Sequence, residues 1–171
     1  MALHWMPATE RTDLLAEPVA RAVAELGPGA EVAEIDPELA DTAAFCERYG
    51  VGLDESANCV VVAGRRGGET RYAACMVLAT ARVDVNGVVR RHLDTRKASF
   101  APMARAVELT GMEYGGITPL GLPGDWPILV DADVAEHPRV VIGSGVRRSK
   151  LAVPGAALAG LKGAEVLPLA I

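Results

Sequence analysis

The stretch Thr110–Asp131, TGMEYGGITPLGLPGDWPILVD, constrains the fold more than any other part of the sequence. It contains five glycines and three prolines. Glycine reaches positive φ at little cost and lets another group approach the main chain, whereas proline fixes φ and removes a hydrogen-bond donor. The stretch therefore predicts a long, shaped loop that leads into a short apolar strand. Such a loop is either a plain connection or part of a functional site, and its apolar side chains favour an anchored conformation.

The rest of the chain alternates between helical and extended patterns. Helices or helical turns are expected over Glu17–Leu26, Leu39–Tyr49, Val83–Leu93 (beginning at Asn86), Pro102–Leu109, Asp133–Glu136 and Gly155–Leu161. Strands are expected over Glu31–Asp36, Asn58–Ala63, Arg71–Leu78 (after a turn at Gly64–Gly68), Lys97–Phe100, Ile128–Val130, Arg139–Ile142, Lys150–Val153 and Glu165–Leu169. These elements interleave without a regular βα repeat. They predict a single mixed α/β domain over residues 1–171, in which residues 1–40 contribute an N-terminal helix and a short strand.

Composition excludes several classes of protein. No apolar run approaches the ~18 residues of a membrane-spanning helix, and the N-terminus lacks the basic and apolar segments of a secretory signal. Three widely spaced cysteines, Cys46, Cys59 and Cys75, predict reduced thiols and a cytoplasmic location. No Cys/His pair has the spacing of metal ligands, so we expect neither a metal nor a cofactor.

The net charge of −5 hides an uneven distribution along the chain. Residues 1–57 hold 12 acidic residues and 3 arginines, giving −9, whereas residues 58–171 hold 10 acidic and 14 basic residues, giving +4. Phosphate contacts depend on local basic clusters whatever the total charge. The candidate phosphate contacts are Arg96, Lys97, Arg147, Arg148 and Lys150. The plain alternative is that these are solvated turn residues.

The glycine-rich stretch also carries a family resemblance. The pattern T-G-x-x-x-G-G-I-T-P-x-G, an apolar strand ending in Asp131, and Gly143-Ser144-Gly145 some ten residues later resemble the YbaK/ProX family. These proteins are free-standing relatives of the editing domain of bacterial prolyl-tRNA synthetases. The resemblance runs from about Asp41 to the C-terminus. It implies a curved, partly barrel-like mixed sheet surrounded by helices, and hydrolysis of amino acids wrongly esterified to tRNA.

Main-chain groups are the leading candidates for this chemistry. Successive N–H groups of a glycine turn form an anion-binding concavity, and one oxyanion donor is typically worth ~10²–10³ in rate. The candidate donors are Gly115, Gly116, Ile117 and Thr118. The resemblance implies that the G-x-x-x-P loop from Gly115 to Pro119 shapes the aminoacyl pocket, and that the Gly143-Ser144-Gly145 turn borders it. Ser144 is expected to position substrate or water and has no evident base partner, so we do not expect a serine nucleophile.

Two polar positions leave alternatives open. Many family members carry a functional lysine at about the position of Asn58, which can form hydrogen bonds but supplies no charge. Asn58 either holds the substrate, marks altered activity, or is a polar residue at a strand end, and Arg96 or Lys97 is a candidate for the missing cation. Asp131 ends an apolar strand, where it either contributes to substrate binding or has a structural role, accepting from a loop N–H or holding an arginine.

These features together predict a trans-editing aminoacyl-tRNA deacylase that hydrolyses the ester of a small mischarged amino acid by water attack. Its partners would be mischarged tRNA and possibly an aminoacyl-tRNA synthetase, and no membrane. The cognate amino acid would be excluded by pocket size. The alternative is a non-catalytic module of the same fold that binds an aminoacyl-tRNA end or a nucleotide, because fold does not fix function.

Overall fold

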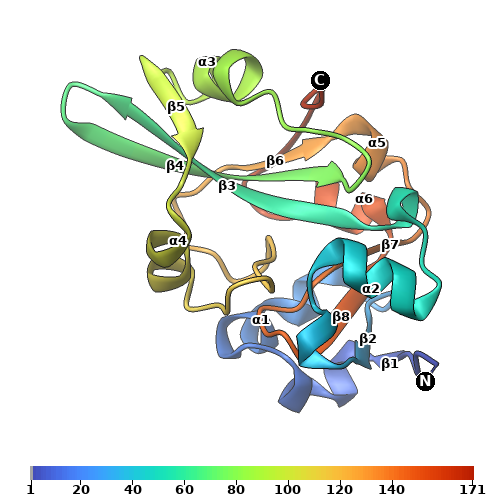
Figure 1. Ribbon diagram of the computed structural model, residues 1–171. Coiled ribbons are helices and arrows are strands. Elements are labelled where there is room, and N and C mark those ends of the chain that lie inside the picture. Colours follow the sequence, from blue (N-terminus) through green and yellow to red (C-terminus); the bar gives the residue numbers. More distant parts are fainter. Residues whose placement is uncertain (1) are drawn as a thin grey trace.

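The computed structural model describes residues 2–171 and contains two β-sheets with short helices around them (Figure 1). The larger sheet has the strand order β5-β3-β4-β6-β9. Its strands are β3 (Ala57–Arg66), β4 (Glu69–Leu78), β5 (Lys97–Phe100), β6 (Ile128–Asp131) and β9 (Ala164–Leu167). The β3–β4 and β3–β5 pairs are antiparallel, whereas the β4–β6 and β6–β9 pairs are parallel. This confirms the expected mixed α/β fold.

The smaller sheet is antiparallel and has the order β1-β2-β8-β7. Its strands are β1 (Met6–Pro7), β2 (Glu31–Glu34), β7 (Val140–Gly143) and β8 (Ser149–Val153). The two sheets meet at a single parallel bridge between Ser56 and Val141. The expected mixed sheet surrounded by helices is present, and a second, smaller sheet lies beside it without closing a barrel. The largest apolar cluster brings together Met76 and Val130 of the larger sheet and Val32 and Leu151 of the smaller one.

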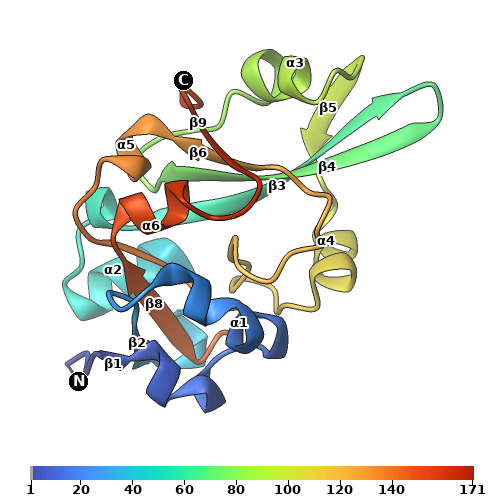
Figure 2. The same cartoon turned by 180° about the vertical axis from the view of Figure 1, so that it is seen from behind.

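Short helices cover the sheets and connect them (Figures 1 and 2). They are α1 (Glu17–Ala22), α2 (Thr42–Tyr49), α3 (Arg90–His92), α4 (Met103–Thr110), α5 (Ala132–Ala135) and α6 (Gly155–Ala159). Figure 2 shows α5 and α6 on the far side of the view in Figure 1, next to β9. The helix α2 ends where Gly50 adopts a left-handed conformation with φ of 69°, as its position as a stop residue predicts.

The helix expected over Val83–Leu93 differs in two ways. It begins as a π-helical turn, Val85–Val89, before it continues as α3. Its N-cap is Asp84 and not Asn86, because the Asp84 carboxylate accepts from the N–H groups of Gly87 and Val88. The Asp84 carboxylate thus satisfies two of the free N–H groups at the start of the helix.

The β3–β4 hairpin is longer than the sequence pattern indicates. β3 continues through Gly64 to Arg66, so the expected turn at Gly64–Gly68 is reduced to Gly67 and Gly68. Both of these glycines have positive φ, 56° and 84°. Gly64 lies within β3, paired with Arg71 and Ala98. A Cβ at this position would lie 2.6 Å from the Thr95 hydroxyl. The glycine is therefore a packing requirement and not a turn signal.

Asp131 holds the C-terminal segment in place. Its buried carboxylate accepts from the Leu169 N–H at 2.8 Å, the Ala170 N–H at 3.2 Å and the Asp133 N–H at 3.3 Å. The last of these contacts caps α5. The carboxylate is thus fully used within the fold, which supports the structural alternative for this residue.

The glycine-rich loop between α4 and β6 packs against the turn that joins β7 to β8. The Gly145 N–H donates to the Gly116 carbonyl at 2.6 Å, and the Glu113 N–H donates to the Gly145 carbonyl at 2.8 Å. A Cβ on Gly143 would lie 2.6 Å from the Gly116 oxygen, and one on Gly116 would lie 2.9 Å from the Val146 main chain. The two backbones therefore approach one another more closely than residues with side chains allow.

This close approach makes a stability prediction. Gly143→Ala should lower the free energy of unfolding by ~1–3 kcal/mol, because the new methyl group overlaps the Gly116 and Ile117 carbonyls. The matched control is Gly124→Ala in the same loop, where a Cβ meets nothing within 4 Å and φ is not left-handed. Gly124→Ala should leave stability unchanged or raise it slightly, because alanine has less backbone freedom in the unfolded chain. Urea denaturation measures both, and equal stability of the two variants would contradict the packing described.

Candidate active site

A cavity of about 290 Å³ lies where β3, α2, the glycine-rich loop and the β7–β8 pair meet. Six separate segments contribute to its wall, from α2 at one side to α4 at the other. The lining residues are Asp41, Thr42, Ala57, Asn58, Cys59, Val60, Met103, Gly115, Ile117, Gly143 and Lys150. The structure therefore brings together five of the residues singled out in the sequence: Asn58, Gly115, Ile117, Gly143 and Lys150.

Asn58 is oriented by a neighbouring helix. The Thr42 hydroxyl, at the first turn of α2, donates to the Asn58 side-chain oxygen at 2.7 Å. The Asn58 amide nitrogen is then the group left to donate into the cavity. The pairing of β3 with β5 begins at Val62. Asn58 lies before this point, where β3 forms a free edge of the sheet. The arrangement makes Asn58 a fixed, neutral donor.

The candidate main-chain donors separate into two groups. The N–H groups of Gly115 and Ile117 have no acceptor within residues 2–171, and both residues line the cavity. The Gly116 N–H is already used, because it donates to the Glu113 carbonyl at 3.0 Å. Thr118 is fully buried and does not line the cavity. The expected set of four donors is thus reduced to Gly115 and Ile117.

Lys150 occupies a different place from the one expected of a phosphate contact. Its side chain is 7% exposed and lines the cavity. The ammonium donates to the Ala40 carbonyl at 2.8 Å and lies 5.3 Å from the centre of the Phe45 ring. Burial lowers the pKa of this ammonium to about 8, although Cys46 and Asp41 act in the opposite direction. Lys150 is therefore a cation of the cavity and not of the outer surface.

The other predicted pocket residues have structural contacts instead. Ser144 is fully buried, and its hydroxyl lies within hydrogen-bond distance of two main-chain acceptors, the Ser149 carbonyl at 3.0 Å and the Val146 carbonyl at 3.1 Å. Gly145 faces Ala16 and Val19 of the N-terminal segment, which leaves no space for a side chain. Pro119 is buried beside a different hollow. Ser144, Gly145, Pro119 and Asp131 are therefore absent from the cavity lining.

Arg147 and Arg148 are also held within the fold. The Arg147 guanidinium donates to the carbonyls of Pro37 and Tyr114 and lies 3.6 Å from the Asp41 carboxylate. Arg148 donates to the Asp13 carbonyl. These contacts join the glycine-rich loop and the β7–β8 turn to the N-terminal part of the chain, while Arg148 as a whole remains exposed.

A separate basic hollow lies at the far end of β3. It is lined by four cationic side chains, namely Arg65, Arg90, Arg96 and Lys97. Lys97 on β5 is directly paired with Arg65 on β3, seven residues along the strand from Asn58. At ~3.3 Å per strand residue, this places the two hollows roughly 23 Å apart. Arg96 and Lys97 thus do not supply a cation to the cavity that contains Asn58.

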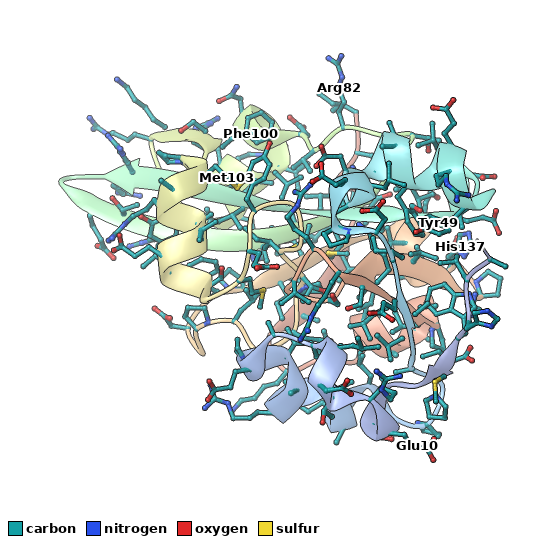
Figure 3. The ribbon with its side chains drawn as sticks, turned by 60° about the horizontal axis from the view of Figure 1, so that its bottom comes forward. Glu10, Tyr49, Arg82, Phe100, Met103 and His137 are labelled. Carbon is teal, nitrogen blue, oxygen red and sulfur yellow. The ribbon has the colours of Figure 1, made fainter. Side chains whose placement is uncertain are left out.

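An apolar hollow lies between the cavity and the basic hollow. It shares Asn58 and Val60 with the cavity and Asn86 with the basic hollow. Phe100 is part of its wall and is 64% exposed. Figure 3 shows Phe100 close to Met103, which lines the cavity and is also exposed. The three hollows therefore follow one another along β3, each sharing a lining residue with the next.

Cysteine chemistry is not available in this cavity. Cys59 lines it, but burial raises the pKa of the Cys59 thiol to about 12, so the nucleophilic thiolate is absent near neutral pH. Within residues 2–171, no three His, Cys, Asp or Glu side chains are grouped as metal ligands. Besides the Asp41 carboxylate, which lies 3.6 Å from the Arg147 guanidinium, the cavity offers hydrogen-bond donors and the Lys150 cation, which suit stabilisation of negative charge on an oxygen.

Sequence reasoning missed three contributors to the cavity. Thr42 and Met103 appeared only as helix residues, although Thr42 orients Asn58 and Met103 forms part of the wall. Lys150 was grouped with Arg147 and Arg148 because they are neighbours in the chain. The signal that separates them is the apolar run Leu151–Val153 that follows Lys150, since such a run marks a buried strand.

Comparisons with known proteins agree with this geometry. The sequence profile of the aminoacyl-tRNA editing domain matches residues 36–161, about three quarters of the chain. The fold is similar to a crystal structure of "a putative trans-editing enzyme for prolyl tRNA synthetase" (TM-score 0.74, 23% identity, 91% of this chain and 96% of that chain). It is also similar to that of hypothetical protein APE2540 (TM-score 0.79, 21% identity, 91% and 100%). No helix among residues 2–171 is long and apolar enough to cross a membrane. The resemblance seen in the sequence is confirmed, and the chain belongs to the aminoacyl-tRNA editing domain family.

Proposed function

We propose that this protein is a trans-editing deacylase that hydrolyses the ester between a small mischarged amino acid and tRNA. The observation that supports this most is the convergence of unused donors on one cavity. These donors come from three segments of the chain: the Gly115 and Ile117 N–H groups from the glycine-rich loop, the Asn58 amide from β3 and the Lys150 ammonium from β8. Donors that are fixed in advance act best where charge develops during a reaction.

The proposed reaction is attack of water on the ester carbonyl carbon. A carbon–oxygen bond to water forms, and the carbonyl oxygen becomes negative. The Gly115 and Ile117 N–H groups stabilise this oxyanion, and Asn58 orients the ester. The bond to the ribose oxygen then breaks, and the ribose oxygen takes the proton released by water. The products are a free amino acid and tRNA with its terminal hydroxyl restored.

The size of the cavity supports a small side chain as substrate. Its volume is about 290 Å³, at the lower end of the range of small-molecule pockets, ~300–1,000 Å³. Val60, Ile117 and Met103 supply apolar parts of its wall. A larger cognate amino acid would be excluded by volume, as in double-sieve editing.

The path along β3 supports RNA as the carrier of the ester. The exposed Phe100 ring offers a surface on which an unpaired base can stack. Beyond it, the four cations of the basic hollow suit backbone phosphates. We therefore propose that the single-stranded end of tRNA follows β3 from the basic hollow to the cavity, and that Arg96 and Lys97 contact it.

Turnover tests the proposed activity directly. The wild-type protein should release the amino acid from at least one member of a panel of mischarged tRNAs. Asn58→Ala should lower kcat/KM by about tenfold, the value of one lost hydrogen bond of ~1.4 kcal/mol. The control is Arg21→Ala, because Arg21 is exposed and paired only with Glu17. Saturable binding of the panel without any release of amino acid would contradict the deacylase and favour a binding module.

Salt dependence tests the proposed RNA path. Binding of tRNA should weaken steeply as salt concentration rises, and Arg96→Ala or Lys97→Ala should each reduce the slope of log K against log salt by about 1. Arg21→Ala should leave the slope unchanged, because Arg21 lies on α1, away from β3 and β5. Nitrocellulose filter binding at several salt concentrations measures the slopes. Equal slopes for all three variants and the wild type would place the RNA elsewhere.

A further inference from the structure

Lys150 is a buried cation with few partners. Its ammonium donates to one protein acceptor, the Ala40 carbonyl, and no carboxylate within residues 2–171 lies within 4.0 Å of it. Asp41 shares the cavity, but its carboxylate is directed to Arg147 at 3.6 Å. An ammonium has three donors, so two N–H groups of Lys150 are left without a protein acceptor. A ligand in the cavity can accept them.

The strand register explains how a lysine fits at this position. Lys150 on β8 is paired with Ala33 of β2 on one side and with Gly143 of β7 on the other. Both neighbours are small, so the long side chain has space on the face of the sheet that packs against α2. Gly143 is also the residue that the Gly116 and Ile117 main chain touches. The register therefore places Lys150 next to the free donors of the glycine-rich loop.

The positive charge of Lys150 is not required for packing in the fold. Removing an ammonium from water is costly unless it is paired, and replacing a buried charge by an apolar side chain of similar volume is often neutral or stabilising. The Phe45 ring beside the Lys150 ammonium is an apolar surface against which a methionine side chain can also pack. A buried charge that costs stability is typical of a functional site.

We propose that the Lys150 ammonium binds the carbonyl oxygen of the aminoacyl ester and stabilises the oxyanion together with the Gly115 and Ile117 N–H groups. This inference rests on the proposed deacylase function. It makes Lys150 the cation of a cavity in which Asn58 is neutral. The positive charge enters from β8, across from β3, and neither Arg96 nor Lys97 is needed to supply it.

Such a role has a pH signature. The pKa of Lys150 is lowered to about 8, mainly by burial, while Cys46 and Asp41 raise it and Arg147 lowers it. Lys150 must be protonated to stabilise an oxyanion, so its contribution is complete well below pH 8 and is lost as pH rises through 8. Stability changes in the opposite direction. The unfolded chain binds the proton more tightly, so the free energy of unfolding rises between about pH 8 and the ordinary lysine value of 10.5.

The test substitutes an apolar side chain of similar length. Lys150→Met should lower kcat by about 100-fold, the loss expected for one oxyanion donor, with a much smaller change in KM. The ratio of wild-type to variant kcat should fall as pH rises from 7 to 9. The melting temperature should be unchanged or higher, because the buried charge is gone. The matched control is Lys162→Met, an exposed lysine outside the cavity, which should leave kcat and its pH profile unchanged.

A binding measurement separates failure of this inference from failure of the proposed function. A transition-state mimic, in which a phosphonate replaces the ester of aminoacyl-adenosine, should bind the wild type at least tenfold more tightly than Lys150→Met by calorimetry. Equal affinity, or a kcat for Lys150→Met within twofold of the wild type, would overturn the role of Lys150. Absence of turnover by the wild type on every mischarged tRNA would instead overturn the deacylase function, and equal affinity would still decide against Lys150.

Discussion

The close contact between the glycine-rich loop and the β7–β8 turn is the constraint on which the cavity depends. Glycines at positions 116, 143 and 145 let the two backbones meet, and the Gly145 N–H closes the contact by donating to the Gly116 carbonyl at 2.6 Å. Gly115 and Ile117, on either side of this contact, line the cavity, and their N–H groups have no acceptor within residues 2–171. A wall made of main chain cannot be displaced by a rotamer change, which suits a site that must hold donors in place before the reaction.

The polar groups of the cavity show a balance between stability and function. Asn58 is neutral and is oriented by Thr42, so it costs the fold little. Lys150 is charged and buried, with a single hydrogen bond to the protein. Arg147, by contrast, is fully engaged by carbonyls and by Asp41. Arg147 thus joins the segments that build the cavity. Lys150 remains inside the cavity without a carboxylate partner among residues 2–171, as expected of a group that binds a ligand.

The sequence alone predicts most of the elements because their patterns are local. The β-branched run of β3, the Pro-initiated α4 and the Gly50 stop of α2 depend only on neighbouring residues. The strand β1 was missed, because its two residues become a strand only by pairing with β2. In the site, Gly115, Ile117, Asn58 and Gly143 were predicted to act together. The place of Lys150 in the cavity was not predicted, because it depends on the register between β7 and β8. A shift of one residue in that register would turn the side chain to the other face of the sheet.

The central claim is that the aminoacyl ester binds between the glycine-rich loop, β3 and β8. Backbone amide NMR during titration with a non-hydrolysable aminoacyl-adenosine analogue tests it most directly. The account predicts that the largest shifts occur at the amides of Gly115, Ile117 and Asn58, with smaller shifts near Phe100. Shifts confined to the hollow beside β1 and β2, which is lined by His4, Arg11 and Glu34 among others, would contradict it.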